Sequence, residues 1–461
     1  MRTPRRAGRT VACLRRLSKG FCIDRHPEEA SAPNKVRLDT SWLPQDNRLL
    51  SLPCELLLHI VNEVSPYDME NFSRSCKQLY NLAKGLAKEA KECIPKYSTV
   101  RLIPYRSSTC VFNFLDDLVR RPRIGLYITE FYVSGLHRTS SPVFTIDIQG
   151  LRAALSSIVA SSPYLNSSES QPWLDTLIEG GLDSAIAFVL LFLPNILRLT
   201  LSEFPTATCI AQVVRSIASV ESGCGSSQTL SKLSSVTARV TGASLNLIAS
   251  FAALPSMQRI SISDLHEDHF EDWSFDHLSR ITELRIEDCR LSVDRVAALL
   301  EGFSALRDFY YHTPNRVWSE HKINPMTLCR TLAKYAGTSL EKLYIAVNDV
   351  WSVSFELPTF IGSLQDFQAL KYLRLETRFL FRDGVIQKLV DMLPPSLETL
   401  ELHPALTTAA ASAMLTDLPE LEESLLPNLR EIRLSRGQIL RDIQASCKSK
   451  GVYVIHTEAV P

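Results

Sequence analysis

The residues with the clearest potential for metal or acid–base chemistry lie between positions 265 and 272, where the sequence reads LHEDHFED. Its two histidines, His266 and His269, are three positions apart, and four acidic residues accompany them. Histidines at such a spacing can share a metal ion on one face of a helix. No cysteine or further ligand motif supports them, so we interpret the stretch as a solvated acidic loop. We predict no metal site and no cofactor.

Motifs of the common enzyme classes are missing from the sequence. It contains no GxxxxGK phosphate loop, no GxGxxG after a strand, no GxSxG and no HExxH. The 11 cysteines are spread from Cys13 to Cys447 without a CxxC pair, which is typical of reduced thiols inside the cell. We therefore predict a protein that is not an enzyme and that resides in the cytoplasm, the nucleus or both.

Charge and hydrophobicity argue against two classes of partner. The 461-residue chain has 50 basic and 50 acidic residues, whereas nucleic-acid binders usually show a basic excess. The apolar run from Ala185 to Leu193 ends at Pro194 and is too short for a membrane span, which needs about 20 residues. We predict that this run is a buried helix and that neither nucleic acid nor membrane is a partner.

The N-terminal segment is strongly basic. It carries six arginines and a lysine before its first acid, Asp24. An organelle transit peptide has this charge pattern but is usually richer in serine, and the simpler interpretation is a disordered basic tail. We predict a disordered tail over residues 1–45 and leave a targeting role open.

A small helical module is predicted over residues 46–95. Pro53 suits the first turn of a helix that Pro66 ends, and Asp68 is the expected N-cap of a second helix over 68–80. A third helix is expected over 84–93. The first helix has an apolar stripe at every fourth residue, namely Leu52, Leu56, Ile60 and Val64. So small a unit has little interior, which favours a partner protein as the cover of this surface.

This module resembles the F-box. The family pattern Leu-Pro-x-Glu-Leu, with Ile four residues on, is matched by Leu52, Pro53, Glu55, Leu56 and Ile60. Its later positions are matched by Asp68, Phe72, Cys76 and Lys77, and a Leu79-Tyr80 pair common in fungal versions follows. Glu70 and Arg74 depart from the pattern, because the family usually has apolar residues there. They either weaken partner binding or face solvent.

The resemblance implies a partner and the residues that contact it. F-box proteins dock onto the Skp-type adaptor of a cullin ubiquitin ligase. By position, the contact would be made by Leu52, Pro53, Leu56, Ile60 and Phe72. The alternative is an ordinary three-helix segment whose apolar residues pack on the rest of the chain.

A repeated pattern occupies residues 191–461. A leucine or similar residue is followed, six residues later, by an alternating strand such as Leu199-Thr200-Leu201 or Ile260-Ser261-Ile262. Helical spacing occurs between copies, as in 293–303, 328–336, 383–393 and 407–418. A strand and a helix at this period are typical of leucine-rich repeats, and the array resembles the irregular repeats of many fungal F-box proteins. The copies lack the regular asparagine of strict repeats. A helix over 438–448, Gly451 as its C-cap and a strand over 452–455 should close the array.

The predicted fold is therefore α/β: a three-helix F-box followed by a curved, leucine-rich-repeat-like solenoid with parallel strands inside and helices outside. Residues 96–190 would connect the two parts and supply a first strand within 123–136. Strand positions between the core residues should line the concave face. Tyrosine and arginine are favoured interface anchors, so we assign target binding to Arg285, Tyr310, Tyr344 and Arg374. Solubility and β-propensity offer another reason for these residue types.

The function implied by the two resemblances is a substrate-recognition subunit of a Skp–cullin–F-box ubiquitin ligase. The F-box would bind the adaptor of the cullin complex, and the solenoid would hold an unknown protein target. The alternative is an F-box-bearing scaffold that is not coupled to ubiquitin transfer.

Overall fold

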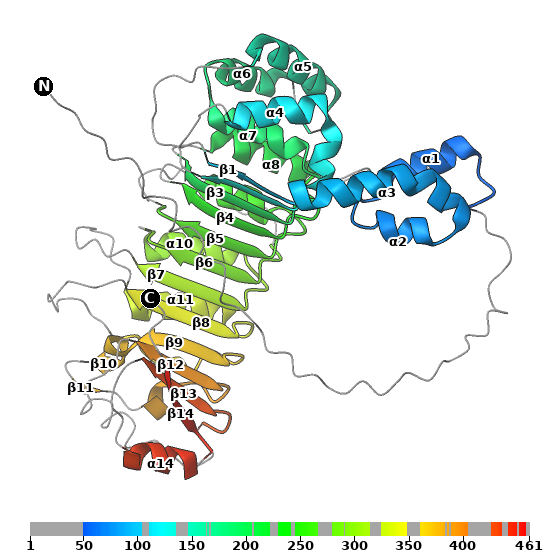
Figure 1. The fold of residues 1–461 in the computed structure, drawn as a ribbon. Helices are drawn as coiled ribbons and strands as arrows, with labels where there is room; N and C mark the ends of the chain where they lie inside the picture. The colour runs from blue at the N-terminus through cyan, green and yellow to red at the C-terminus, as the bar shows by residue number, and fades with distance from the viewer. Residues whose placement is uncertain are drawn as a thin grey trace, which may run out of the picture. The chain divides into compact units, whose positions relative to one another are not determined.

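A computed structural model gives the fold of the chain (Figure 1). It describes residues 49–103, 110–134, 146–162, 164–165, 167–204, 207–221, 229–240, 245–265, 279–289, 291–313, 324–347, 360–382, 385–386, 389–403, 426–435, 441–449 and 451–457. The chain divides into two compact units, residues 1–57 and 58–461, so that the first helix crosses the boundary.

Three helices form the F-box region: α1 (Cys54–Glu63), α2 (Met69–Arg74) and α3 (Lys77–Tyr97). A small apolar cluster is built around the buried residues Val61, Met69 and Ala83. So few buried side chains are consistent with the small interior expected for a unit of this size.

The second predicted helix, over 68–80, is wrong in its extent. Helix α2 ends at Arg74, and Cys76 has extended backbone angles and caps α3 by accepting a hydrogen bond from the Leu79 amide at 3.4 Å. The third helix is correspondingly longer than the predicted 84–93. Asp68 does occupy the N-cap position of α2, but its side chain makes no capping hydrogen bond.

A 12-stranded parallel sheet runs through the rest of the chain. Its order, β1-β2-β3-β4-β5-β6-β7-β8-β9-β12-β13-β14, follows the sequence, as expected for stacked repeats. The strands are β1 (Thr99–Leu102), β2 (Glu130–Ser134), β3 (Arg198–Phe204), β4 (Ser235–Val240), β5 (Arg259–Ser263), β6 (Glu283–Glu287), β7 (Asp308–Thr313), β8 (Lys342–Val347), β9 (Tyr372–Glu376), β12 (Thr399–His403), β13 (Glu431–Ser435) and β14 (Tyr453–Thr457). The predicted solenoid of parallel strands and intervening helices is confirmed.

The sheet starts earlier in the chain than the sequence pattern suggested. Strand β2 lies within the segment predicted to hold the first strand, but β1 precedes it and pairs with it in parallel. Both belong to the same sheet as the strands after residue 191. The connecting segment therefore supplies two strands of the sheet, where the sequence predicted one.

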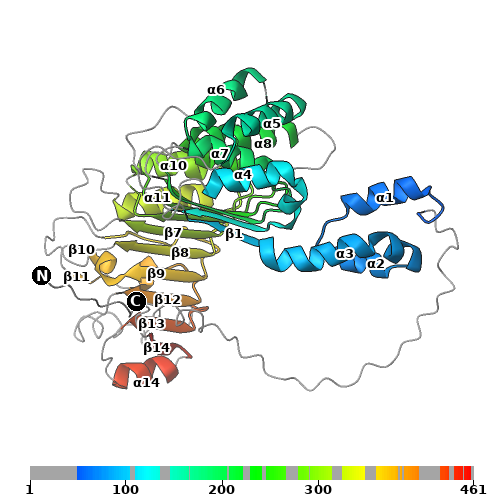
Figure 2. The ribbon, with the colours of Figure 1, turned by 45° about the horizontal axis from the view of Figure 1, so that its top comes forward.

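The intervening segments are helical. They comprise α4 (Cys110–Arg120), α5 (Ile148–Ser161), α6 (Ser167–Ile178), α7 (Leu182–Leu191), α8 (Thr208–Glu221), α9 (Leu245–Ala252), α10 (Val293–Glu301), α11 (Pro325–Ala336), α12 (Leu389–Met392) and α14 (Arg441–Ser449), with 3-10 turns η2 (Pro122–Tyr127) and η4 (Thr377–Leu380). Figures 1 and 2 show α10 and α11 along one face of the strands. The apolar run near residue 190 is the buried helix α7, as predicted.

Of two further predicted helices, one is shorter than predicted and the other lies outside the described residues. The helix predicted over 383–393 is only the short α12, because Phe381–Arg382 (β10) and Val385–Ile386 (β11) pair as an antiparallel hairpin. The helix predicted over 407–418 lies outside the described residues.

One continuous core lies between sheet and helices. Along most strands, alternate residues are buried, as in β6, where Leu284 and Ile286 are inaccessible. The same core includes Val296 and Leu299 of α10 and Leu328 of α11. The intervening strand residues point the other way, onto the concave face.

A row of short polar side chains bonds to main-chain carbonyls just before the strands. Ser339 lies three residues before β8 and donates to the Leu306 carbonyl at 2.8 Å. Ser396 lies three residues before β12 and donates to the Leu370 carbonyl at 2.9 Å. The same position is used by Asn195, Ser256 and Asn428. These bonds satisfy turn carbonyls of the preceding repeat that would otherwise lack a partner.

The C-terminal end of the sheet is closed by a helix, a glycine C-cap and a strand, as predicted. Gly451 adopts φ +78° after α14, and its amide bonds back to the Lys448 carbonyl. The final strand begins at residue 453 rather than 452. Its Tyr453 amide bonds to the Arg430 carbonyl just before β13, so the main-chain groups of Val454 face the outer edge of the sheet. There the Gln444 side chain of α14 donates to the Val454 carbonyl at 3.2 Å.

Candidate functional site

The parallel register aligns concave-face residues in columns. In the middle column, residue pairing runs from Ser261 through Arg285, Tyr310, Tyr344, Arg374 and Glu401 to Arg433. All four residues predicted for target binding are thus neighbours on consecutive strands, β6 to β9. The column also contains Arg101, Tyr132 and Thr237, which the sequence pattern missed because strands β1 and β4 are short or degenerate copies.

The four predicted target-binding residues form one stack of planar groups, here called the Arg–Tyr stack. The rings of Tyr310 and Tyr344 are nearly parallel, at an angle of 3°, with centroids 4.0 Å apart. The Arg285 guanidinium lies 5.7 Å from the Tyr310 centroid. At the other end, the Arg374 guanidinium lies 4.6 Å from the Tyr344 centroid. Ring stacking and cation–π contacts of this kind hold the four side chains in fixed orientations.

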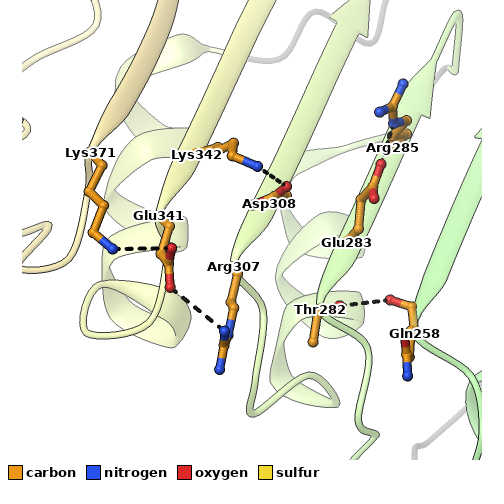
Figure 3. Close-up of polar contacts among 9 residues, drawn as sticks. All are labelled: Gln258, Thr282, Glu283, Arg285, Arg307, Asp308, Glu341, Lys342 and Lys371. Carbon is orange, nitrogen blue, oxygen red and sulfur yellow. Dashed lines mark hydrogen bonds and ion pairs between the residues drawn. The ribbon is translucent and has the colours of Figure 1, made fainter. Parts of the chain in front are cut away.

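A carboxylate neutralises each end of the Arg–Tyr stack. Glu283 Oε1 accepts a hydrogen bond from Arg285 Nε at 2.6 Å, within strand β6 (Figure 3). Arg374 Nε lies 3.2 Å from Glu401 Oε1, in an ion pair whose geometry is not that of a hydrogen bond. The stack is therefore ordered before any partner arrives, and its two positive charges are already compensated.

Glu401 is the centre of a polar cluster in the concave face, although its side chain is only 8% exposed. It accepts a hydrogen bond from the Tyr372 hydroxyl, and its Oε1 lies 2.7 Å from His403 Nε2. Arg433, which pairs with Glu431 at 2.9 Å, approaches it from the next strand. Four surrounding side chains thus compensate one buried carboxylate.

The environment fixes the protonation of these groups. Burial alone would raise the pKa of the Glu401 carboxyl, but the bonds from His403 and Tyr372 and the charges of Arg374 and His403 outweigh it and lower the pKa to about 2. Burial raises the pKa of Tyr310, and the neighbouring Tyr344 adds to this. Burial and the bond to Glu401 likewise raise the pKa of Tyr372. These tyrosines keep their hydroxyl protons at neutral pH, and the proton of Tyr372 is already donated to Glu401.

A row of ion pairs follows the strand starts beside the Arg–Tyr stack (Figure 3). Glu341 lies between Lys371, at 3.4 Å, and Arg307, at 3.8 Å. Lys342 bonds to Asp308 at 2.9 Å on the adjacent strand. Exposed pairs of this kind contribute about 0–1 kcal/mol each, so they tune the surface charge more than they stabilise the fold.

The predicted adaptor-binding residues differ in exposure. Pro53 is exposed and Leu56 has 49% of its surface accessible, whereas Leu52, Ile60 and Phe72 are partly buried. Leu57 and Val61, which widen the apolar stripe of α1, are fully or almost fully buried. Leu58 and Tyr80 are further large side chains that remain exposed. The adaptor-binding role of the five residues stays a prediction.

The two departures from the F-box pattern face solvent. Glu70 and Arg74 of α2 form an ion pair at 2.5 Å, and both side chains are 71% exposed. Of the two interpretations left open by the sequence, solvent exposure is the one that the structure supports. Their charges replace apolar residues without burying an uncompensated charge.

Groups suited to covalent or metal chemistry are few in the part of the chain that the structure describes. Burial raises the pKa of the Cys289 thiol to about 12, and burial beside Asp183 raises that of Cys209 to about 12, so neither is a thiolate at neutral pH. Among the described residues, no group of three or more histidines, cysteines and carboxylates is placed to hold a metal ion. His266 and His269 lie outside these residues. None of the described helices is both long and apolar enough to cross a membrane.

Two family models match the chain and agree with this architecture. A leucine-rich repeat domain model matches residues 144–458, and an F-box domain model matches residues 49–90. A solved structure of a protein from Bacteroides fragilis is 14% identical over 53% of this chain and 70% of its own, with a TM-score of 0.27. No curated protein matches the chain. Both domains are typically non-catalytic and serve protein interaction. The chain belongs to the leucine-rich repeat domain family and carries an F-box domain ahead of its repeats.

Proposed function

We propose that this chain is the substrate-recognition subunit of a Skp–cullin–F-box ubiquitin ligase, acting in the cytoplasm, the nucleus or both. The F-box binds the Skp-type adaptor, and the concave face of the repeats holds a target protein. The observation that carries the proposal is the F-box match over residues 49–90, ahead of a repeat domain.

Exposed apolar side chains support adaptor binding through the F-box. Leu56 has 49% and Leu58 has 42% of its surface accessible. Covering one leucine side chain is worth about 1.5–3 kcal/mol, so a few such contacts make a stable interface. A polar substitution at Leu56 would remove this energy without disturbing a buried position.

The reaction would depend on proximity. The subunit contributes neither a base nor a nucleophile, but holds its target near a conjugating enzyme bound elsewhere in the ligase. Tethering raises the local concentration of the reacting groups and lowers the entropic cost of their encounter. The Arg–Tyr stack supports the target-binding half of the proposal, because its side chains are fixed before binding.

Co-purification of the full chain with the adaptor and cullin tests this function. We expect Leu56→Asp to weaken adaptor capture by roughly tenfold or more, since 1.4 kcal/mol corresponds to a factor of ten. The double variant Leu56→Asp/Ile60→Asp should abolish capture. Leu197→Asp is the matched control, because this leucine is 42% exposed but lies next to β3 in the repeat domain.

Two results separate the possible outcomes. Undiminished adaptor capture by a folded double variant would contradict the assignment of these residues. Capture of the adaptor without a cullin would instead support a scaffold that is not coupled to ubiquitin transfer. Circular dichroism of each variant shows whether the repeat domain remains folded.

A further inference from the structure

Most charges on the described part of the concave face are already paired. Ion pairs join Arg198 to Glu130, Arg239 to Asp264, Arg285 to Glu283, Lys342 to Asp308, Arg374 to Glu401 and Arg433 to Glu431. A partner gains little from a charge placed against such a pair. The positions that discriminate between partners are therefore those whose charge has no counterpart.

Two uncompensated charges lie close to the Arg–Tyr stack. Arg259, the first residue of β5, is exposed and has no ionic or hydrogen-bonded side-chain partner among the described residues. Glu287, the last residue of β6, is partly buried and likewise has no side-chain partner in the described ranges. A third unpaired charge, Arg101, lies on β1, at the other end of the sheet.

The register gives the spacing of the pair. Arg259 is paired with Glu283, which starts the strand that Glu287 ends. At about 3.3 Å per residue along a strand and about 4.8 Å between strands, the two Cα atoms are about 14 Å apart. Glu287 also lies near the stack, because its charge adds to burial and Tyr344 in raising the pKa of Tyr310.

The side chains around the two charges differ in size. On β5 the concave positions after Arg259 are Ser261 and Ser263, which are paired with Thr237 and Arg239 of β4. The large planar groups of the Arg–Tyr stack begin on the very next strand. A partner segment thus finds small hydroxyl groups beneath it and the edge of Arg285 and Tyr310 at its side.

We propose that strands β5–β7 bind an extended protein segment that carries an acidic and a basic side chain four residues apart. The acidic side chain binds Arg259, the basic one binds Glu287, and the residues between them pack against Arg285 and Tyr310. Four residues of extended chain span about 13 Å, whereas a helix would need about nine residues for 14 Å. This inference deepens the proposed function, since the segment would belong to the captured target.

Selection from a random peptide library against the purified full chain tests the inference and does not require the target protein. Wild-type protein should enrich peptides with an Asp or Glu four positions from a Lys or Arg. With Arg259→Glu, the enriched peptides should carry Lys or Arg at the position where the wild-type protein selects Asp or Glu. The exchange Arg259→Glu/Glu287→Arg should enrich peptides with the two charges reversed. Arg280→Glu is the matched control, because Arg280 is exposed and unpaired in the described structure but lies outside the strands.

Binding of one enriched peptide, followed by fluorescence anisotropy, gives the size of the effect. Each single charge reversal should weaken it about tenfold, and the exchanged protein should recover affinity for the charge-reversed peptide. The same consensus from every variant, or enrichment with no charge spacing, would overturn the inference. Loss of adaptor capture would count only against the proposed function, because peptide selection does not require the adaptor.

Discussion

The F-box region and the concave face expose opposite kinds of surface. In the F-box region, large apolar side chains such as Leu56 and Leu58 remain accessible beside a small buried cluster. On the concave face, arginines and tyrosines are stacked, and glutamates compensate the charges of the arginines. The first surface can gain free energy by being covered, and the second can select by the geometry of its donors. Affinity for a constant partner and discrimination among variable ones call for these two different chemistries.

The largest difference should appear in the free energy of unfolding when a leucine is changed to alanine in the repeat core and in the F-box region. Leu284→Ala removes a fully buried side chain from the repeat core and should lower the free energy of unfolding by about 2–5 kcal/mol. Leu56→Ala should change it by less than about 0.5 kcal/mol, because nearly half of that side chain is accessible. Urea denaturation of the full chain measures both. Equal losses would mean that Leu56 serves the stability of this chain, and the contrast would disappear.

A smaller effect is expected at the centre of the concave-face cluster. Glu401→Gln leaves Arg374 and Arg433 without their shared carboxylate and should destabilise the repeat domain by about 1–3 kcal/mol. The matched change Glu287→Gln removes an unpaired carboxylate and should cost little. Thermal unfolding followed by circular dichroism compares the two variants.

The same carboxylate makes stability depend on pH. Because folding lowers the pKa of Glu401 from about 4.5 to about 2, its contribution is fully present above pH 4.5 and is lost as the pH falls towards 2. The stability difference between wild type and Glu401→Gln should shrink over that interval. A difference that stays constant from pH 6 to pH 3 would contradict the lowered pKa.

The smallest effect concerns the ring stack itself. A double-mutant cycle with Tyr310→Leu and Tyr344→Leu should give a coupling energy of about 0.5–1.5 kcal/mol, as found for stacked aromatic pairs. Urea unfolding of the four proteins provides the cycle. Additive losses would indicate that each ring is held by its own strand, and the idea of a preordered stack would have to be abandoned.

Strand positions and their neighbours were largely predictable from sequence. A period of two within each copy assigns inward and outward residues, and parallel pairing of equivalent copies places Arg285, Tyr310, Tyr344 and Arg374 side by side. The stacking of their side chains was not predictable, because rotamers depend on contacts that a one-dimensional pattern does not contain. The compensation by Glu401 was missed for the same reason.

Local breaks in helices and strands were harder to predict. The apolar spacing from Met69 to Ala83 continues across Ser75 and Cys76, so periodicity alone gave no sign of the break that separates α2 from α3. Strand β1 has only four residues, too few for a convincing alternation. The β10–β11 hairpin flanks Asp383-Gly384, a dipeptide favoured in tight hairpin turns, which the helical spacing obscured.

The Gln444 amide has a consequence for how the array ends. A last strand normally offers an unsatisfied row of main-chain groups on which a foreign strand can add, and this is how many sheet proteins begin to aggregate. Here the chain's own glutamine occupies the outward carbonyl of Val454. An intruding strand would have to displace that amide before it could pair with Val454, so this part of the edge is harder to extend than a bare strand.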